Sequence, residues 1–226
     1  MKGKRLSRRE MKEDALVTFA FRAVDFVKKH RSKVILAVAL VVVAIVGTAY
    51  VSSSRKGAEN EACQQLLAGM LQQRANNHLG AAAAYEDVVS RHSGTKSGKT
   101  ALLYLGHARY ELGQYDQASE AYQRYLGREK GDKLTVAQAK RGLAACKENT
   151  GKFEEAADLY QQVARTLDKD DAIPEDLMFA ARSLKLAGKP DKAVELLQEI
   201  VDSYPKYQEV DKARVLLAEI QHGSSR

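Results

Sequence analysis

The segment LGHARYELGQYDQASEAY (Leu105–Tyr122) sets a pattern that much of the chain repeats. A small residue, Gly106, is followed after seven positions by Gly113, after five more by Ala118 and after four more by Tyr122. Glycine at Gly113 favours the end of a helix, because it adopts the left-handed backbone conformation without steric strain. The segment therefore predicts two helices joined by a tight bend, with small residues where the helices approach each other.

The same frame occurs four times from Ala62 onward. Its turn residues, Asn76, Gly113, Gly151 and Gly188, lie 37, 38 and 37 positions apart. The complete frames are Gly69/Asn76/Ala81/Tyr85, Gly106/Gly113/Ala118/Tyr122, Ala144/Gly151/Ala156/Tyr160 and Ala181/Gly188/Ala193/Leu197. We expect the large apolar residue to fill the gap between successive units, and the apolar residues of 209–221 to form a closing cap helix. The sequence thus predicts an all-α helical solenoid of about four repeats over residues 62–226.

This pattern resembles the tetratricopeptide repeat, whose period is about 34 residues. The similarity is strongest in Leu105–Tyr122, and its second half returns in Gly151–Tyr160 and Gly188–Leu197. Pro205 stands where the family places a closing proline, whereas Ser93, Lys130 and Asp168 depart from it. The resemblance implies a scaffold that binds protein segments on the concave face lined by the first helix of each repeat.

A second stretch, VILAVALVVVAIVGTAYV (34–51), contains no charged residue. Its 18 residues would form a helix of about 27 Å, close to the roughly 30 Å hydrocarbon core of a bilayer. Residues 1–33 contain eleven Lys or Arg and four Asp or Glu, so they carry the whole net charge of +7. Because short basic flanks stay in the cytosol, we expect a single-pass inner-membrane protein with a cytosolic N-terminus and a periplasmic C-terminal domain.

A cleaved signal peptide is the alternative interpretation, since Gly47-Thr48-Ala49 offers small residues at a cleavage position. The basic region of 33 residues is longer than the basic region of an ordinary signal peptide, which favours an uncleaved anchor.

Apolar residues from Asp14 onward, with polar residues at three- and four-residue spacings, also predict an amphipathic helix in 1–33. It would lie in the membrane interface or dock on another membrane protein. Residues 52–61 form a short polar linker, or continue the membrane helix.

The whole layout is similar to that of the ancillary subunit family of the bacterial Sec translocon: a short basic cytosolic segment, one span and an external array of about four repeats. That similarity implies the translocon, periplasmic chaperones or exported chains as protein partners. A repeat adaptor in cell-wall or outer-membrane assembly is the alternative function.

The sequence favours no enzyme, cofactor or metal site. Gly98-Lys99-Thr100 suggests a phosphate loop, but Ser93 replaces the required first glycine and a helix rather than a strand precedes it. Cys63 and Cys146 lie two repeats apart, too far for an intramolecular disulfide in an array whose units contact only their neighbours. The five histidines lack ligand spacing. Residues 52–226 carry 25 basic and 25 acidic residues, interspersed, which argues against nucleic-acid binding.

The tetratricopeptide resemblance also predicts the partner-binding side chains, from their spacing along the first helix of each repeat. They are Leu66, Met70, Gln73, Leu103, His107, Tyr110, Arg141, Glu148, Met178, Arg182 and Lys185. This set is apolar and aromatic in the first two repeats and more charged in the last two. Leu66, Leu103 and Met178 could alternatively be core residues. Arg141 alone offers a weak substitute for the Lys/Asn clamp with which some family members hold a terminal carboxylate.

Overall fold

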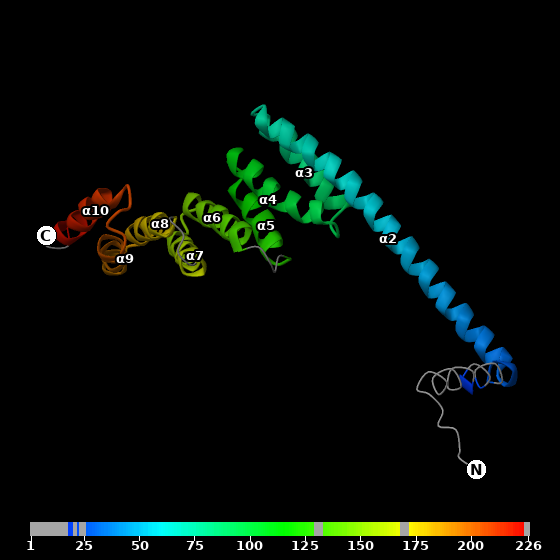
Figure 1. Ribbon diagram of the computed structural model, residues 1–226. Helices are drawn as coiled ribbons and strands as arrows, with labels where there is room; N and C mark the ends of the chain where they lie inside the picture. Colours follow the sequence, from blue (N-terminus) through cyan, green and yellow to red (C-terminus); the bar gives the residue numbers. More distant parts are fainter. Residues whose placement is uncertain (1–17, 20–21, 23–25, 129–132, 168–171, 224–226) are drawn as a thin grey trace, which may run out of the picture. The chain divides into compact units, whose positions relative to one another are not determined.

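The computed structural model describes residues 18, 19, 22, 26–128, 133–167 and 172–223 (Figure 1). The chain divides into two compact units, Met1–Lys56 and Gly57–Arg226. Every regular element in the described part is an α-helix. Most of the predicted amphipathic helix lies outside the described residues.

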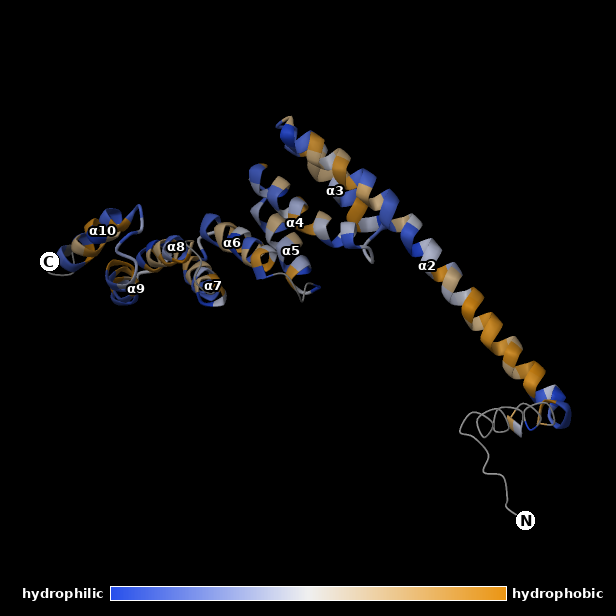
Figure 2. Cartoon of the chain, in the orientation of Figure 1, coloured by the Kyte–Doolittle hydropathy of each residue, from blue (hydrophilic) through white to orange (hydrophobic). Residues whose placement is uncertain are grey.

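Helix α2 (Arg31–Arg74) is continuous through residues 52–61, so this segment extends the helix instead of forming a separate linker. Its first part is exposed and predominantly apolar from Ile35 to Val51 (Figure 2), with Gly47 and Thr48 among its least apolar positions. Within the described residues, α2 is the helix whose length and composition would allow it to cross a membrane. A signal sequence near the N-terminus would have the same length and composition.

The second unit is a solenoid of helix pairs. Repeat 1 comprises residues 57–74 of α2 and helix α3; α4 and α5 form repeat 2, α6 and α7 repeat 3, α8 and α9 repeat 4, and α10 follows as the cap helix. The bounds are α3 (His78–Arg91), α4 (Lys96–Glu111), α5 (Tyr115–Leu126), α6 (Lys133–Asn149), α7 (Phe153–Thr166), α8 (Ile173–Leu186), α9 (Pro190–Ser203) and α10 (Val210–Gly223). From α3 onward each helix packs chiefly against its sequence neighbours, and α4 also contacts α6. The predicted all-α repeat solenoid is confirmed.

The four predicted turn residues have left-handed backbone conformations. The φ angle is 56° at Asn76, 71° at Gly113, 74° at Gly151 and 71° at Gly188. At the second of these bends the Gly113 N–H donates to the carbonyl of residue 110, and the next N–H donates to that of residue 109. These two bonds form a Schellman motif, which satisfies the last carbonyls of the first helix, and the other three bends repeat it.

Tyr122 shows how the repeats pack. Its side chain is 1% exposed and lies between Gly106 of its own repeat and Gly142 of the next. A Cβ added at Gly106 would lie 2.6 Å from Tyr122 Cε1, and one added at Gly142 would lie 2.4 Å from Tyr122 Cζ. The ring therefore fills the gap between repeats, as expected. The role of Gly142 was not foreseen from the sequence.

Glu59 of α2 caps the first turn of α4. Its carboxylate accepts hydrogen bonds from the N–H of Lys96 (2.7 Å), the N–H of Ser97 (3.0 Å) and the hydroxyl of Ser97 (2.7 Å). Thr95 Oγ1 accepts from the N–H of Gly98 at 2.9 Å, so the first three amides of α4 are satisfied. A carboxylate also complements the positive end of the helix dipole.

Replacing Glu59 by alanine is therefore expected to destabilise the repeat domain by about 1–2 kcal/mol. The measurement is urea unfolding of a fragment spanning residues 52–226. Glu120 provides the matched control, because its exposed pair with Arg124 is worth less than about 0.5 kcal/mol. Equal losses in Glu59→Ala and Glu120→Ala would show that the tertiary cap does not stabilise the domain.

Candidate interaction surface

Three of the predicted partner-binding side chains belong to the core. Leu66, Leu103 and Met178 are 6%, 4% and 2% exposed. The expectation that they are exposed is wrong, and the alternative that they pack against neighbouring helices holds. Leu66, Leu103 and Met178 occupy equivalent positions, ten residues before the turn of their repeats, and this position faces the core.

Three further residues of the set bind the tyrosines of their own repeats. Tyr85 Oη donates to Gln73 Oε1 at 2.8 Å, and Tyr160 Oη donates to Glu148 Oε2 at 3.1 Å. Tyr122 Oη and His107 Nδ1 share a hydrogen bond of 2.9 Å. The polar side chains thus connect the first helix of a repeat to its second helix.

Burial shifts the pKa values of Tyr85 and His107. It raises the pKa of the Tyr85 hydroxyl to about 12. It lowers the pKa of His107 below its usual value, against the opposing effect of Glu111. His107 is therefore a neutral ring at neutral pH and offers no charge to a partner.

Glu148 also connects two repeats, because its Oε1 accepts a hydrogen bond of 2.5 Å from the Ser183 hydroxyl on α8. Arg141 makes a second connection of this kind. Its Nε donates to Asp176 Oδ1 at 2.7 Å, and its terminal nitrogen donates to Oδ2 at 2.6 Å. Asp176 is 1% exposed. Arg141 is thus engaged in a bidentate ion pair and is not free to clamp a partner's carboxylate.

The other four predicted residues keep accessible surface. Met70 and Tyr110 are half-buried, and Arg182 and Lys185 are exposed. Tyr110 Oη accepts a bond from Asn149 Nδ2 at 3.2 Å, and Lys185 pairs with Glu219 at 3.2 Å.

A cavity of about 400 Å³, here called the central cavity, opens where the first helices of repeats 2, 3 and 4 meet. Its aromatic walls include Tyr110 and Phe179, and Ala145 and Gly142 contribute little bulk. The lining residues are His107, Tyr110, Glu111, Tyr122, Gln138, Arg141, Gly142, Ala145, Tyr160 and Phe179. The structure therefore brings together His107, Tyr110 and Arg141 of the predicted set. Gln138, Ala145 and Phe179 were missed. The repeat frame could have identified Ala145, because it stands six positions before its turn residue, as the predicted residues Met70, His107 and Arg182 do.

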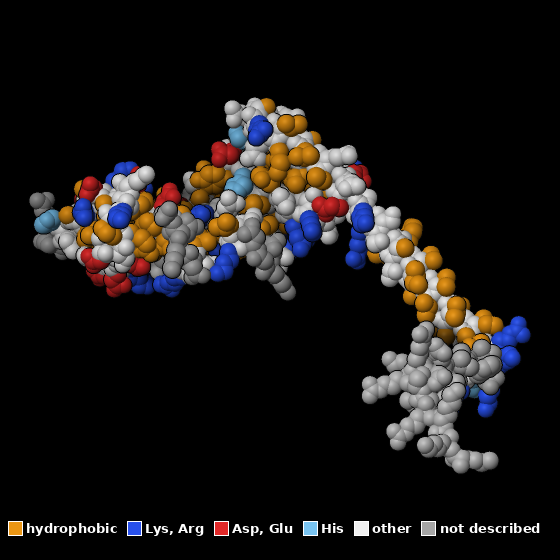
Figure 3. Space-filling model, viewed as in Figure 1, with side chains coloured by type: hydrophobic (Ala, Val, Ile, Leu, Met, Phe, Trp, Pro, Cys, Tyr) orange, Lys and Arg blue, Asp and Glu red, His pale blue; other side chains and the backbone are white. Residues whose placement is uncertain are grey.

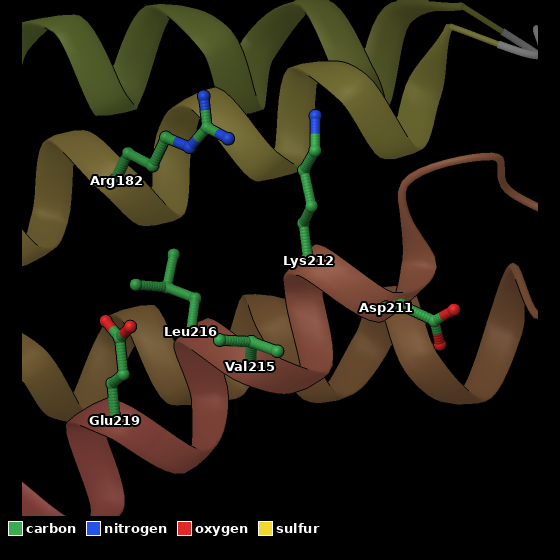
Figure 4. Close-up of a pocket in the computed structure, with 6 residues that line it drawn as sticks. All are labelled: Arg182, Asp211, Lys212, Val215, Leu216 and Glu219. Carbon is green, nitrogen blue, oxygen red and sulfur yellow. The ribbon is translucent and has the colours of Figure 1, made fainter.

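A second pocket of about 410 Å³ lies between α8 and α10 (Figure 4). Leu216 and Val215 form its apolar part, with Arg182 and Lys212 above them and Glu219 beside Leu216. Asp211 also lines the pocket, on the side away from Glu219. Because its lining carries side chains of both charges, this pocket favours one class of partner side chain less clearly than the aromatic central cavity does.

The described residues contain no cluster of His, Cys, Asp or Glu that could hold a metal ion. The Gly98-Lys99-Thr100 segment is the beginning of α4, and a Cβ added at Gly98 would lie 2.0 Å from the His92 carbonyl oxygen. Tight local packing therefore explains this glycine. Cys63 and Cys146 are free thiols, and burial raises the pKa of Cys146 to about 11, which disfavours the reactive thiolate.

The model of a tetratricopeptide repeat-like domain family matches residues 25–166, which is more than half of the chain. The chain belongs to this tetratricopeptide repeat-like family. A second tetratricopeptide repeat model matches residues 180–207. Comparison with curated protein sequences finds no significant match.

Solved structures show the same fold. A protein of Podosopora anserina described as a kinesin light chain with nearly identical TPR-like repeats has a TM-score of 0.60 and 21% identity, over 74% of this chain and 89% of that one. MamA has a TM-score of 0.53 and 18% identity, over 70% of this chain and 94% of that one. Tetratricopeptide repeats are typical of non-catalytic scaffolds, and in this chain they imply a scaffold for protein–protein interaction.

Proposed function

We propose that this protein is a membrane-anchored scaffold whose repeat domain binds protein segments at the external face of the inner membrane. Residues 34–51 would hold the domain at the bilayer, and the basic segment before them would stay in the cytosol. The partners would belong to protein translocation or to periplasmic chaperone networks, as the layout of the chain suggests. Anchoring raises the effective concentration of the domain near such partners.

The observation that carries the binding part of this proposal is the central cavity. Its rings come from three successive repeats, so a partner that enters it contacts α4, α6 and α8 together. Tyr110 and Phe179 offer large apolar area with little loss of side-chain freedom. Because His107 is neutral and Arg141 is paired with Asp176, an apolar or aromatic side chain of a peptide fits this cavity better than a carboxylate.

Cell-wall or outer-membrane assembly is the second candidate setting for the same scaffold. The cavity serves either setting, since apolar burial does not depend on the identity of the partner. Co-purification in mild detergent separates the two, because the translocon and envelope chaperones would be retained in the first case only.

Filling the central cavity is expected to reduce partner capture strongly. A photo-crosslinking residue at Gln138, which is exposed on α6 and lines the cavity, should trap partner proteins in living cells. Ala145→Phe adds a ring to the cavity without removing a hydrogen bond, and should reduce the adducts about tenfold or more. Leu134→Phe is the control, because Leu134 is 61% exposed and does not line the cavity. Undiminished adducts in a folded Ala145→Phe variant would refute this site.

A further inference from the structure

The outward face of α2 in repeat 1 carries large apolar side chains in solvent. Leu67 is 54% exposed and Leu71 is 66% exposed, and Figure 3 shows apolar side chains gathered over this end of α2 and α3. Asn60, Cys63 and Gln64 continue the exposed face one and two turns earlier. These five residues are called the α2 face.

The other repeats show what this face is built to contact. Leu67 stands nine positions before its turn residue, where repeats 2, 3 and 4 have Tyr104, Gly142 and Phe179. Each of these packs on the tyrosine of the preceding repeat. The ring centroids of Tyr85 and Tyr104 are 5.7 Å apart, those of Tyr160 and Phe179 are 5.3 Å apart, and Gly142 lies against Tyr122.

The position of Leu71 in the repeat leads to the same conclusion, that this face is built for contact. Leu71 stands five positions before its turn, and the corresponding residues Ala108, Cys146 and Ser183 are each 0% exposed. The α2 face is therefore the stacking face of repeat 1, and no described residue covers it. Terminal repeats of solenoids usually present a polar outer face, so this apolar one indicates an interaction surface.

The chemistry of the face selects its occupant. None of its five residues is charged. In a two-fold pair each residue lies near its own copy, so an uncharged face is self-complementary and meets no like-charge repulsion. Stacking on the C-terminal end of another copy is disfavoured, because Arg182, Asp211, Lys212 and Glu219 surround the exposed apolar residues of α10. Such head-to-tail stacking would also form open filaments.

We propose that the α2 face pairs with the same face of a second copy in a parallel, two-fold symmetric dimer. Cys63, Leu67 and Leu71 recur once per helical turn along this face, so they would line the contact between two parallel helices. The parallel direction rests on the proposed anchor, since two copies inserted in one membrane have the same orientation. The face begins only nine residues after Val51.

Cys63 offers a chemical test of the parallel pair. Cys63 is exposed and lies one helical turn before Leu67, so a parallel pair brings the two Cys63 side chains together. Cys146 is 0% exposed, so it is not accessible for a disulfide between two chains. Mild oxidation of the full chain in native membranes should give a disulfide-linked dimer that persists in Cys146→Ala and disappears in Cys63→Ala. A Cys63 adduct with a different protein and no homodimer would overturn the proposal.

A charged variant of the face separates specific pairing from random collision. Leu67→Glu with Leu71→Glu places like charges in the seam and should reduce the disulfide dimer about tenfold or more. Leu134→Glu with Leu186→Glu is the matched control, because these leucines are 61% and 62% exposed elsewhere. A dimer equally abundant in both double variants would refute the pairing.

The mass of the full chain in mild detergent tests the dimer without any substitution, and carbonate extraction of membranes tests the anchor separately. We expect twice the chain mass, and a monomer would overturn the inference. A dimer released by carbonate would refute the anchor alone, whereas a monomer that resists carbonate would refute the dimer alone.

Discussion

Replacing Gly142 by leucine is expected to lower the free energy of unfolding of the repeat domain by about 3 kcal/mol or more. Helix propensity alone favours the change by up to about 1 kcal/mol. The new Cβ, however, would lie 2.4 Å from Cζ of Tyr122, a ring that is 1% exposed and already touches Gly106 on α4. Moving the ring away would break its packing on Gly106 and its hydrogen bond with His107, so the clash outweighs the gain in propensity.

Gly127 offers the matched control for this substitution. A Cβ at Gly127 would meet its nearest atom at 3.5 Å, which is an ordinary contact. Thermal and urea unfolding of the 52–226 fragment should therefore show a large loss for Gly142→Leu and a small change for Gly127→Leu. Equal stability of the wild-type and Gly142→Leu fragments would mean that repeats 2 and 3 do not pack through Tyr122 as described.

The second large effect is expected at the ion pair between repeats 3 and 4. Arg141→Leu leaves the carboxylate of Asp176, which is 1% exposed, without its guanidinium partner. Removing one partner of a buried ion pair costs about 3–5 kcal/mol. Urea unfolding of the 52–226 fragment measures the loss.

A double variant tests whether the charge is the cause. Leu103 of repeat 2 stands at the position of Arg141, and Ala139 of repeat 3 stands at the position of Asp176. Arg141→Leu with Asp176→Ala therefore restores an apolar pair that the array already uses, and should recover most of the lost stability. If the double variant is less stable than Arg141→Leu alone, the buried carboxylate does not explain the loss.

The turns could be predicted from the sequence because their signal is local. A left-handed residue strongly favours glycine or asparagine, so Asn76, Gly113, Gly151 and Gly188 mark the bends without knowledge of the packing. Their spacing then fixes the number of helix pairs and the period of the solenoid.

The faces of the first helices could not be predicted in the same way. Neighbouring helices cover α4, α6 and α8 on more than one side, so a spacing rule does not separate buried from exposed positions there. Leu66, Leu103 and Met178 were therefore assigned to the wrong environment. Arg141 shares their position in the repeat, and a comparison of equivalent positions would have shown that its charge needed a partner such as Asp176.

The topology of the chain tests the central claim, that the repeat domain is an interaction scaffold held outside the cytosol by residues 34–51. The measurement is protease digestion of intact spheroplasts, followed by detection of both ends of the chain. We predict that residues 52–226 are digested while the N-terminal segment stays protected until lysis, because the whole net positive charge precedes the apolar stretch. A repeat domain that resists protease in intact spheroplasts and is cut only after lysis would contradict the account.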